Sequence, residues 1–456
     1  MEAPMQTSVA NQAPARAPLP PRVRIGYSLG SLVTGAFGTV PGLLLLPYLT
    51  DTLGVPAAAA GLLVLLPKAW DVVANPTVGR ISDRTQTRWG ARRPYLLFAG
   101  LTLAVLFALM FAAPFGRSGA VVYVAATFLL TATAFAFFQV PYGSMPAEMT
   151  STSSERTRLM TWRVVMLATA ILVSGAIAPL VVDLGGGGIP GHRAMGVFVA
   201  AIMVVGTLCA FYGTANAPLG EVTAAEPSLR AQLRVAAANR PFRVLVACFV
   251  VQAAGVACML AGVQYFADHV LHQHDATTML FITVVSPALV VTPFWRRVGD
   301  KLGKLRGYVL ASATLTAATL ALVSAPFVPR FVVYVLVAIM GFGYAGQQLF
   351  GLAMLPDCIA ADEARTGKRQ GGVFTGVWTA GETLGLALGP GIFGTVLQLF
   401  HYVPSSTGVA AAQSALAERG VLLGFTLVPA IIVGLALVFL RGYTAVPEPV
   451  PASAPA

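Results

Sequence analysis

The sequence predicts an all-α membrane protein with twelve transmembrane helices in two six-helix halves. Hydrophobic residues fill 56% of the 456 positions and charged residues only 10%, whereas a soluble globular domain has about 25% charged residues. Weakly polar stretches recur along the whole chain, each close to the roughly 20 residues that span a bilayer as an α-helix. Backbone groups in lipid must bond within their own segment, so these stretches are predicted to be helices.

A polar linker divides the predicted spans into two sets of six. The first set lies at 24–49, 57–79, 94–113, 119–143, 160–182 and 194–214, within a first half at 24–215. The linker at 216–241 is followed by a second half at 242–441, with spans at 242–268, 276–295, 307–326, 330–354, 370–400 and 419–441. The Pro-rich and Ala-rich ends, 1–23 and 442–456, are expected to be disordered arms, and the first shows no apolar run of a cleavable signal peptide.

The basic residues are distributed unevenly between the two sets of loops. One set holds only Arg117, Arg193, Arg330 and Arg419, Lys68 lies inside an apolar segment, and nearly all other Lys and Arg residues lie in the termini and the alternate loops. This asymmetry predicts an inner (cytoplasmic) membrane protein of bacterial type with the linker and both termini in the cytoplasm. The net charge of +11 is thereby explained by topology, and a nucleic-acid partner is not expected.

The two halves resemble each other in the loop after their second span. VGRISDRTQTRWGARRPY at 78–95 and RRVGDKLGKLRGY at 296–308 each place Asp before a basic residue, then a basic cluster before an aromatic. Ion pairs there would break and reform as a cytoplasmic gate opens, and the alternative is that these residues only anchor the loops to the membrane surface. The predicted gate residues are Asp83, Arg84, Arg88, Asp300 and Lys301.

Three ionisable residues, Lys68, Asp71 and Glu382, lie well inside predicted spans. Such groups are costly in a bilayer unless they are paired or face water, so they indicate function. Lys68, Asp71 and Asn75 are three and four residues apart and share one helix face. The oxygens of Asp71 and Asn75 suit a sodium ion, and Asp71 alone suits a proton, whereas a purely structural Lys68 to Asp71 ion pair is the alternative.

Other polar and aromatic residues inside spans are candidates to line a substrate cavity. Sugars are typically bound by amide and carboxylate hydrogen bonds with an aromatic ring against the sugar face, although single aromatic residues in spans more often pack or anchor. The candidates are Tyr27, Gln139, Tyr142, Gln252, Gln264, Tyr265, Gln347, Gln348 and Trp378, together with Lys68 and Glu382.

No catalytic or metal-binding constellation stands out in the sequence, so neither an enzyme nor a cofactor is expected. The cysteines Cys209, Cys248, Cys258 and Cys358 lack close metal-type spacing and are expected to be small hydrophobes. The histidines near the ends of spans are expected at the surface or in loops: His192, His269, His272 and His274.

Three blocks of the sequence resemble the glycoside-pentoside-hexuronide:cation symporters, the melibiose-permease-like branch of the major facilitator superfamily. They are KAWDVVANPTVGRISDRTQTRWGARRPYLL (68–97), PYGSMPAEMTSTSSERTRLMTWRVV (141–165) and PDCIAADEARTGKRQGGVFTGVWTAGETLGLALGP (356–390). The resemblance implies a major facilitator fold with the sugar between the halves. It implies that a pair of acids on the second helix binds the coupling cation, and it adds Arg163 and Thr379 to the cavity residues.

The sequence departs from that family at several positions. Asp71 matches the first acid of the pair, but Asn75 replaces the second, which weakens sodium coupling and favours a proton or no coupling. Gly35 and Gln139 stand where related sugar permeases place acids, and Thr383 stands where a lysine is usual.

These observations predict a secondary transporter, functional as a monomer, that moves a sugar or glycoside by alternating access with H+ or Na+. The alternative is a carrier that imports or exports a lysolipid or another amphipathic metabolite.

Overall fold

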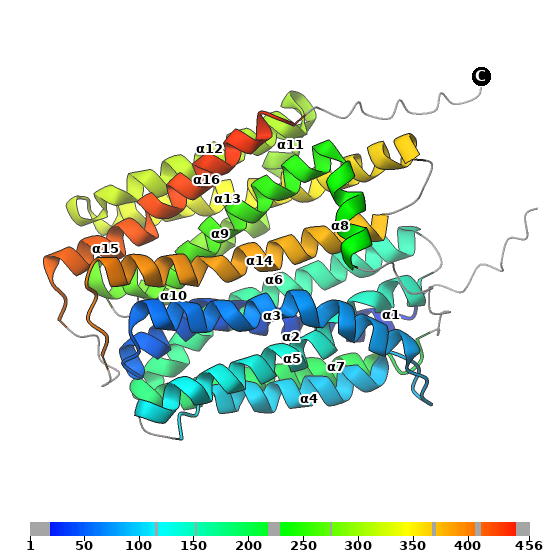
Figure 1. The fold of residues 1–456 in the computed structure, drawn as a ribbon, viewed down its shortest axis with the longest axis horizontal. Coiled ribbons are helices and arrows are strands. Elements are labelled where there is room, and N and C mark those ends of the chain that lie inside the picture. The colour runs from blue at the N-terminus through cyan, green and yellow to red at the C-terminus, as the bar shows by residue number, and fades with distance from the viewer. Residues whose placement is uncertain are drawn as a thin grey trace, which may run out of the picture.

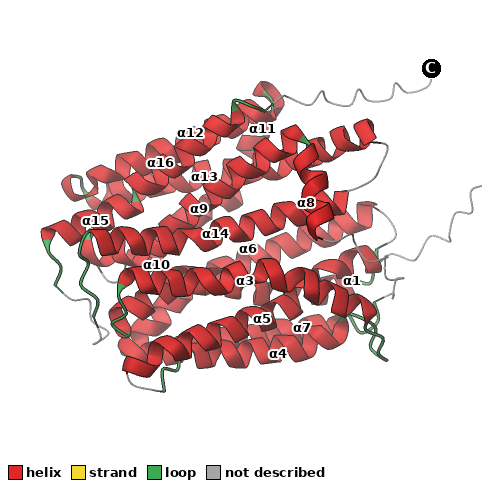
Figure 2. Cartoon of the chain, viewed as in Figure 1, coloured by secondary structure: helices red, strands yellow, loops and turns green. Residues whose placement is uncertain are grey.

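The computed structural model describes residues 19–114, 117–150, 153–217, 229–273, 276–366, 371–405 and 412–443. Helices account for all regular structure in these ranges, as Figure 2 shows. The first half contains α1 (Pro21–Leu29), α2 (Ser31–Val40), η1 (Pro41–Leu45), η2 (Tyr48–Thr52), α3 (Ala57–Arg84), α4 (Arg93–Met110), α5 (Arg117–Met149), α6 (Ser153–Leu184) and α7 (Gly188–Gly213). The second half contains α9 (Arg240–His269), α10 (Ala276–Val290), α11 (Thr292–Leu302), α12 (Lys304–Ala321), η3 (Leu322–Phe327), α13 (Arg330–Thr366), α14 (Gly371–Leu399), α15 (Ala415–Phe425) and α16 (Leu427–Leu440).

Each predicted span coincides with one helix or with consecutive helices, which confirms the all-α membrane architecture. Of the described helical stretches, 10 are long and apolar enough to cross a membrane. The remaining two predicted spans correspond to α3, which carries Lys68 and Asp71, and to α10, which has 15 residues. Both pack into the bundle, α3 against α14 and α10 against α6 and α13.

Prolines interrupt the regular helix in two of the spans because each removes a backbone donor. The first span changes to π-helical geometry at Pro41, and after Pro47 a second short π-helical stretch, Tyr48–Thr52, follows it. Pro287 lies inside α10 and Pro293 in the first turn of α11, on either side of the break at Val291. The break separates the transmembrane part from the short amphipathic helix that follows.

The chain ends and the linker differ in part from the predicted disordered or polar segments. The predicted N-terminal arm was too long, because α1 begins at Pro21, and residues 1–18 lie outside the described ranges. Within the linker, Leu229–Ala238 form helix α8, and α9 begins at Arg240. Residues 218–228 of the linker and 444–456 of the predicted tail also lie outside the described ranges.

The two halves meet along α3 and α14, which lie side by side across the middle of Figure 1. In that view α4, α5 and α7 lie below this pair and α12, α13 and α16 lie above it. The start of α1 and the end of α16 lie at the same end of the bundle, which we call the terminal end. The other end, where α9 and α14 finish and α15 begins, is called the opposite end.

Candidate functional site

The acid predicted to bind a cation, Asp71, is buried in the middle of α3. Its side chain is 7% exposed, and its Oδ1 atom has no hydrogen-bond partner. Lys68, one turn away, interacts with it electrostatically. Asn75 follows one turn later and is half-buried. The structure thus places Lys68, Asp71 and Asn75 on consecutive turns, and it leaves one carboxylate oxygen of Asp71 available to a ligand.

The packing of α3 against α14 brings charges from both halves to one depth. A Cβ added at Gly61 would lie 2.8 Å from the carbonyl oxygen of Pro390, and one at Gly394 would lie 2.4 Å from that of Ala57. The helices are therefore antiparallel and closely packed. Because both rise about 1.5 Å per residue, Lys68 lies at the depth of Glu382. Glu382 is half-buried and interacts electrostatically with Tyr344 of α13.

Tyr27, Tyr142 and Arg163 form one cluster within the first half. The tyrosine rings stack with centroids 4.5 Å apart, each hydroxyl donates to the other residue's carbonyl oxygen, and Ser31 Oγ lies 3.0 Å from the Tyr142 hydroxyl. The Arg163 guanidinium lies 4.9 Å from the centre of the Tyr142 ring. Both tyrosines are fully buried and join α1 to α5, whereas Arg163 is half-buried. Of these three, Arg163 is therefore the most accessible to a solute.

Three more of the predicted substrate residues lie in different environments. Trp378 is buried, its ring stacks on Phe249 at 4.1 Å between centroids, and its Nε1 atom has no partner. Thr379 beside it is exposed. Gln139 on α5 is half-buried, and its Oε1 atom has no partner. Their role in binding a substrate stays a prediction.

The structure describes the surroundings of two residues that differ from the sugar permeases, Gly35 and Thr383. A Cβ at Gly35 would lie 2.6 Å from the Cβ of Ala170, so α2 and α6 approach too closely there for an acidic side chain. The Thr383 hydroxyl donates to the Thr379 carbonyl at 3.0 Å within its own helix. The missing acid at Gly35 thus follows from close helix packing.

At the terminal end, the ion pairs differ from the predicted gate pairs. Arg84, Arg88, Asp300 and Lys301 are exposed, and the side chain of Asp83 lies outside the described residues. The gating role of these five residues stays a prediction.

Two ion pairs that the sequence reasoning missed lie near them. Arg92 Nε donates to Glu148 Oε1 at 2.7 Å in the first half, and Lys304 Nζ donates to Asp357 at 2.7 Å in the second. Each joins the start of a half's third span to the end of its fourth. The repeat between the two loops was the signal that could have revealed them.

At the opposite end, hydrogen bonds join the two halves. Tyr402, after α14, donates to Asp51 Oδ1 at 2.8 Å, and His269 Nε2 lies 3.0 Å from the Tyr402 oxygen. Since the hydroxyl hydrogen of Tyr402 is directed at Asp51, His269 Nε2 carries the hydrogen of the second bond. Thr50 Oγ1 lies 2.6 Å from the Tyr265 hydroxyl, and the Ser405 amide donates to the Thr50 carbonyl at 3.0 Å.

Asp51 is nearly buried and lies beyond the Leu45 end of the first candidate span. Burial raises the pKa of its carboxyl from 3.8 to about 7, and the bond from Tyr402 partly opposes the rise. We call Asp51, Tyr402 and His269 the latch. Sequence reasoning missed it because Asp51 and Tyr402 are 351 positions apart.

The prediction of surface histidines was wrong for His192 and His269. His269 belongs to the latch, and His192 is buried with its ring 4.7 Å from that of Tyr48. Both lie at helix ends that pack into the bundle, and a local pattern does not distinguish such an end from an exposed one. Gln264 lines a small cavity with His192, and its predicted role in substrate binding stays a prediction. His274 lies outside the described residues.

Comparison with known proteins gives a consistent result. The family described as "MFS/sugar transport protein" matches residues 26–444. The "Inner membrane symporter YicJ" of Escherichia coli (strain K12) is 25% identical over 427 residues, covering 92% of this chain and 91% of that protein. The "Isoprimeverose transporter" of Lactiplantibacillus pentosus is 27% identical over 435 residues, covering 92% and 88%.

Among solved structures, a bacterial homologue of the human lysosomal transporter Spinster, inward-facing and unoccupied, has a similar fold. Its TM-score is 0.70 at 14% identity, with 93% of this chain and 97% of that chain covered. The similarity confirms the predicted major facilitator fold.

Proposed function

Because the chain belongs to the MFS/sugar transport protein family, we propose that it carries a sugar or glycoside across the membrane by cation symport. Like its relatives, it is a membrane transporter and not an enzyme. Its relatives' names include a symporter and an isoprimeverose transporter. The solute, the cation and the direction of transport are our proposals.

The observation that carries the proposal is the buried carboxylate of Asp71 between the halves. A buried carboxylate oxygen without a partner is costly unless a proton or a cation satisfies it. Lys68 interacts with Asp71, and Glu382 of the other half lies at the depth of Lys68. Binding of a cation at Asp71 therefore changes the electrostatic interactions on both sides of the interface along which the two halves rock.

We propose that the coupling ion is a proton or a sodium ion held by Asp71, with Asn75 as a second oxygen donor. Asn75 supplies an oxygen without a charge, so the site holds one negative charge close to the positive charge of Lys68. One negative charge attracts a hard cation less strongly than two do. This supports the proton as the leading candidate and sodium as the second.

The solute is proposed to lie between Arg163 and the exposed face of α14 that carries Thr379. Arg163 presents donors from the first half, and Thr379 and Glu382 present a hydroxyl and a carboxylate from the second. Hydroxyl-rich solutes match such a mixed set of donors and acceptors. The terminal end is proposed to face the cytoplasm, in agreement with the basic residues in its loops.

The test is uphill transport in proteoliposomes supplied with a panel of labelled glycosides, with a pH gradient or a sodium gradient. Asp71→Asn is expected to abolish accumulation against the solute gradient and to spare exchange, because the variant cannot be protonated and deprotonated. Glu382→Gln, which changes the other intramembrane acid, separates binding from coupling. Because Glu382 is proposed to contact the solute, this variant is expected to weaken the affinity for the glycoside, while the accumulation that remains still depends on the ion gradient.

Undiminished accumulation by Asp71→Asn would remove that residue from coupling. Transport of lysolipids in place of glycosides, or net export under both gradients, would replace the proposed function with the amphipathic carrier.

A further inference from the structure

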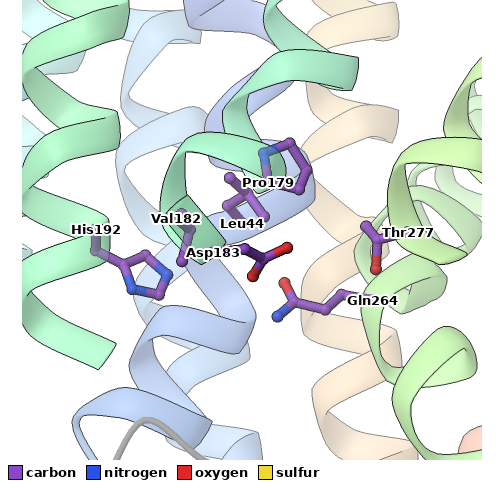
Figure 3. A pocket seen from close by; sticks show the side chains of 7 residues that line it. All are labelled: Leu44, Pro179, Val182, Asp183, His192, Gln264 and Thr277. Carbon is purple, nitrogen blue, oxygen red and sulfur yellow. The ribbon is translucent and has the colours of Figure 1, made fainter. Parts of the chain in front are cut away.

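A second polar site lies between the halves, away from Asp71 and nearer the opposite end. It is a cavity of about 10 Å³, which is room for one particle of the size of a water molecule. Figure 3 shows its lining: Leu44, Pro179, Val182, Asp183, His192, Gln264 and Thr277. Asp183 and His192 come from α6 and α7 of the first half, and Gln264 and Thr277 come from α9 and α10 of the second.

Three lining side chains have a polar atom without a hydrogen-bond partner. These atoms are Gln264 Oε1, Thr277 Oγ1 and His192 Nε2. Thr277 and His192 are each 4% exposed, so solvent does not compensate for the missing bonds. Buried polar atoms in proteins are nearly always paired, and several unpaired atoms around one cavity indicate an occupant.

The polar lining of the cavity consists mostly of hydrogen-bond acceptors. His192 Nδ1 lies 2.7 Å from the carbonyl oxygen of Gly188, which only accepts, so Nδ1 carries the hydrogen. The neutral ring then presents a lone pair at Nε2. The Asp183 carboxylate and Gln264 Oε1 are acceptors as well, and the Thr277 hydroxyl accepts or donates. An occupant with positive charge suits this set, and oxygen ligands are those that hard cations prefer.

We propose that the cavity binds one hard monovalent cation, Na+, through oxygens of Asp183, Gln264 and Thr277. This site is separate from the cation site proposed at Asp71 and does not depend on which solute is carried. Its ligands come from both halves, so the ion binds only while the halves meet at this level. Binding therefore stabilises closure of the opposite end by its differential affinity for the closed state.

The packing next to the cavity supports a site that assembles on closure. Thr278, adjacent to Thr277, donates to the Ala176 carbonyl of α6 across the interface at 3.1 Å. A Cβ added at Gly175 of α6 would lie 2.2 Å from the ring of Phe281 on α10. These contacts hold α6 and α10 together, and they fix Thr277 relative to Asp183.

The test measures sodium binding to purified full-length protein in the Asp71→Asn background, which removes the other proposed site. Binding of radioactive Na+ and the thermal unfolding midpoint are recorded in NaCl and in choline chloride at equal ionic strength. Asp71→Asn alone is expected to keep a sodium-specific rise in midpoint. Adding Thr277→Val is expected to weaken the sodium affinity at least about tenfold, the lower end for disturbing a metal site.

Two further variants test the charge of the site and its location. Asp183→Asn added to Asp71→Asn is expected to abolish the sodium response, because it removes the charge. Thr207→Val is the matched control, because Thr207 is buried on α7 with an unpartnered hydroxyl and does not line the cavity. It is expected to leave the sodium response unchanged.

The proposal is overturned if NaCl and choline chloride act alike on Asp71→Asn between pH 6 and 8, which would leave a water molecule as the occupant. It is also overturned if neither Thr277→Val nor Asp183→Asn changes the sodium response. Both outcomes leave the sugar symport proposal untouched, since that proposal is tested by transport and by Asp71.

Discussion

At the opposite end of the bundle, hydrogen bonds pass from one half to the other, whereas the ion pairs described above at the terminal end each lie within one half. Tyr402 bonds to Asp51 across the interface. Arg92 bonds to Glu148 inside the first half, and Lys304 bonds to Asp357 inside the second. Bonds between halves must break when that end opens, but bonds within a half persist through a rigid-body rocking motion.

Substitutions at the two ends are therefore expected to change different properties of the protein. The terminal pairs hold the third and fourth spans of each half together, so disturbing them changes the stability of that half. The opposite end carries the latch, and disturbing the latch changes the balance between closed and open states. Opening is measured by the rate at which a cysteine introduced at buried Val55 reacts with a maleimide, in a background with the native cysteines replaced by alanine.

The largest effect is expected from Glu148→Gln. This change replaces the carboxylate that the Arg92 guanidinium, 7% exposed, contacts at 2.7 Å, and removing one partner of a buried ion pair costs about 3 to 5 kcal/mol. Thermal or denaturant unfolding of the purified protein measures the loss in the free energy of unfolding. The reactivity of a cysteine at position 55 is expected to stay the same, because the pair lies within one half.

Asp357→Asn is the matched control for this prediction. Lys304 and Asp357 are 38% and 29% exposed, and an exposed pair contributes at most about 1 kcal/mol. Equal losses for the two variants would show that burial does not distinguish the pairs.

Gly394→Ala is expected to have the next largest effect, on opening. The added Cβ would lie 2.4 Å from the carbonyl oxygen of Ala57, so α14 must move away from α3. Overpacking of this kind costs about 1 to 3 kcal/mol. Maleimide labelling at position 55 is expected to accelerate by about tenfold, which corresponds to roughly 1.4 kcal/mol.

Gly434→Ala provides the control for the steric argument, because its added Cβ would lie 3.6 Å from the nearest atom, Cγ2 of Thr316. Acceleration of labelling by this variant as well would attribute the effect to the loss of glycine and not to separation of α3 and α14.

The spans were predictable from sequence because each is a continuous apolar run, and bilayer thickness fixes its length. Lys68, Asp71 and Glu382 were also predictable as intramembrane residues, since charge within such a run is conspicuous. The equal depth of Lys68 and Glu382 was not predictable, because it depends on the close packing of α3 and α14 at Gly61 and Gly394.

The latch and the cavity could not be predicted from local sequence patterns, for a related reason. Tyr402 and His192 lie at helix ends, where buried and exposed residues have similar neighbours in sequence. Their partners are distant in the chain, and only the association of spans creates their hydrogen bonds and the acceptor-lined cavity.

Tyr402→Phe is expected to open the opposite end without a steric change. It removes the hydroxyl that bonds both Asp51 and His269, and leaving buried polar groups unsatisfied costs about 1 to 2 kcal/mol in the closed state. Faster labelling at position 55 is the readout. Tyr443→Phe, which removes a hydroxyl near Cys358 in the second half only, is expected to leave labelling unchanged. Unaltered labelling in Tyr402→Phe would show that the latch does not limit opening.

A change of pH acts on the same latch through Asp51, without any substitution. The closed state raises the pKa of Asp51 from 3.8 to about 7, so it binds the proton more tightly than an open, solvated state does. Closure is therefore favoured most below about pH 4, loses stability as pH rises to about 7, and changes little above that.

Between pH 6 and 8 the expected change is about tenfold in the open-to-closed ratio, with faster labelling at higher pH after correction for maleimide reactivity on a cysteine peptide. The groups that face Asp51 are Tyr402, Tyr265 and Asp268, and His269 adds a titratable group one bond further away. Asp51→Asn separates their contributions, because an amide has no proton to lose in this range. A pH dependence that survives Asp51→Asn would assign the titration to His269 and would leave Asp51 as a hydrogen-bond acceptor alone.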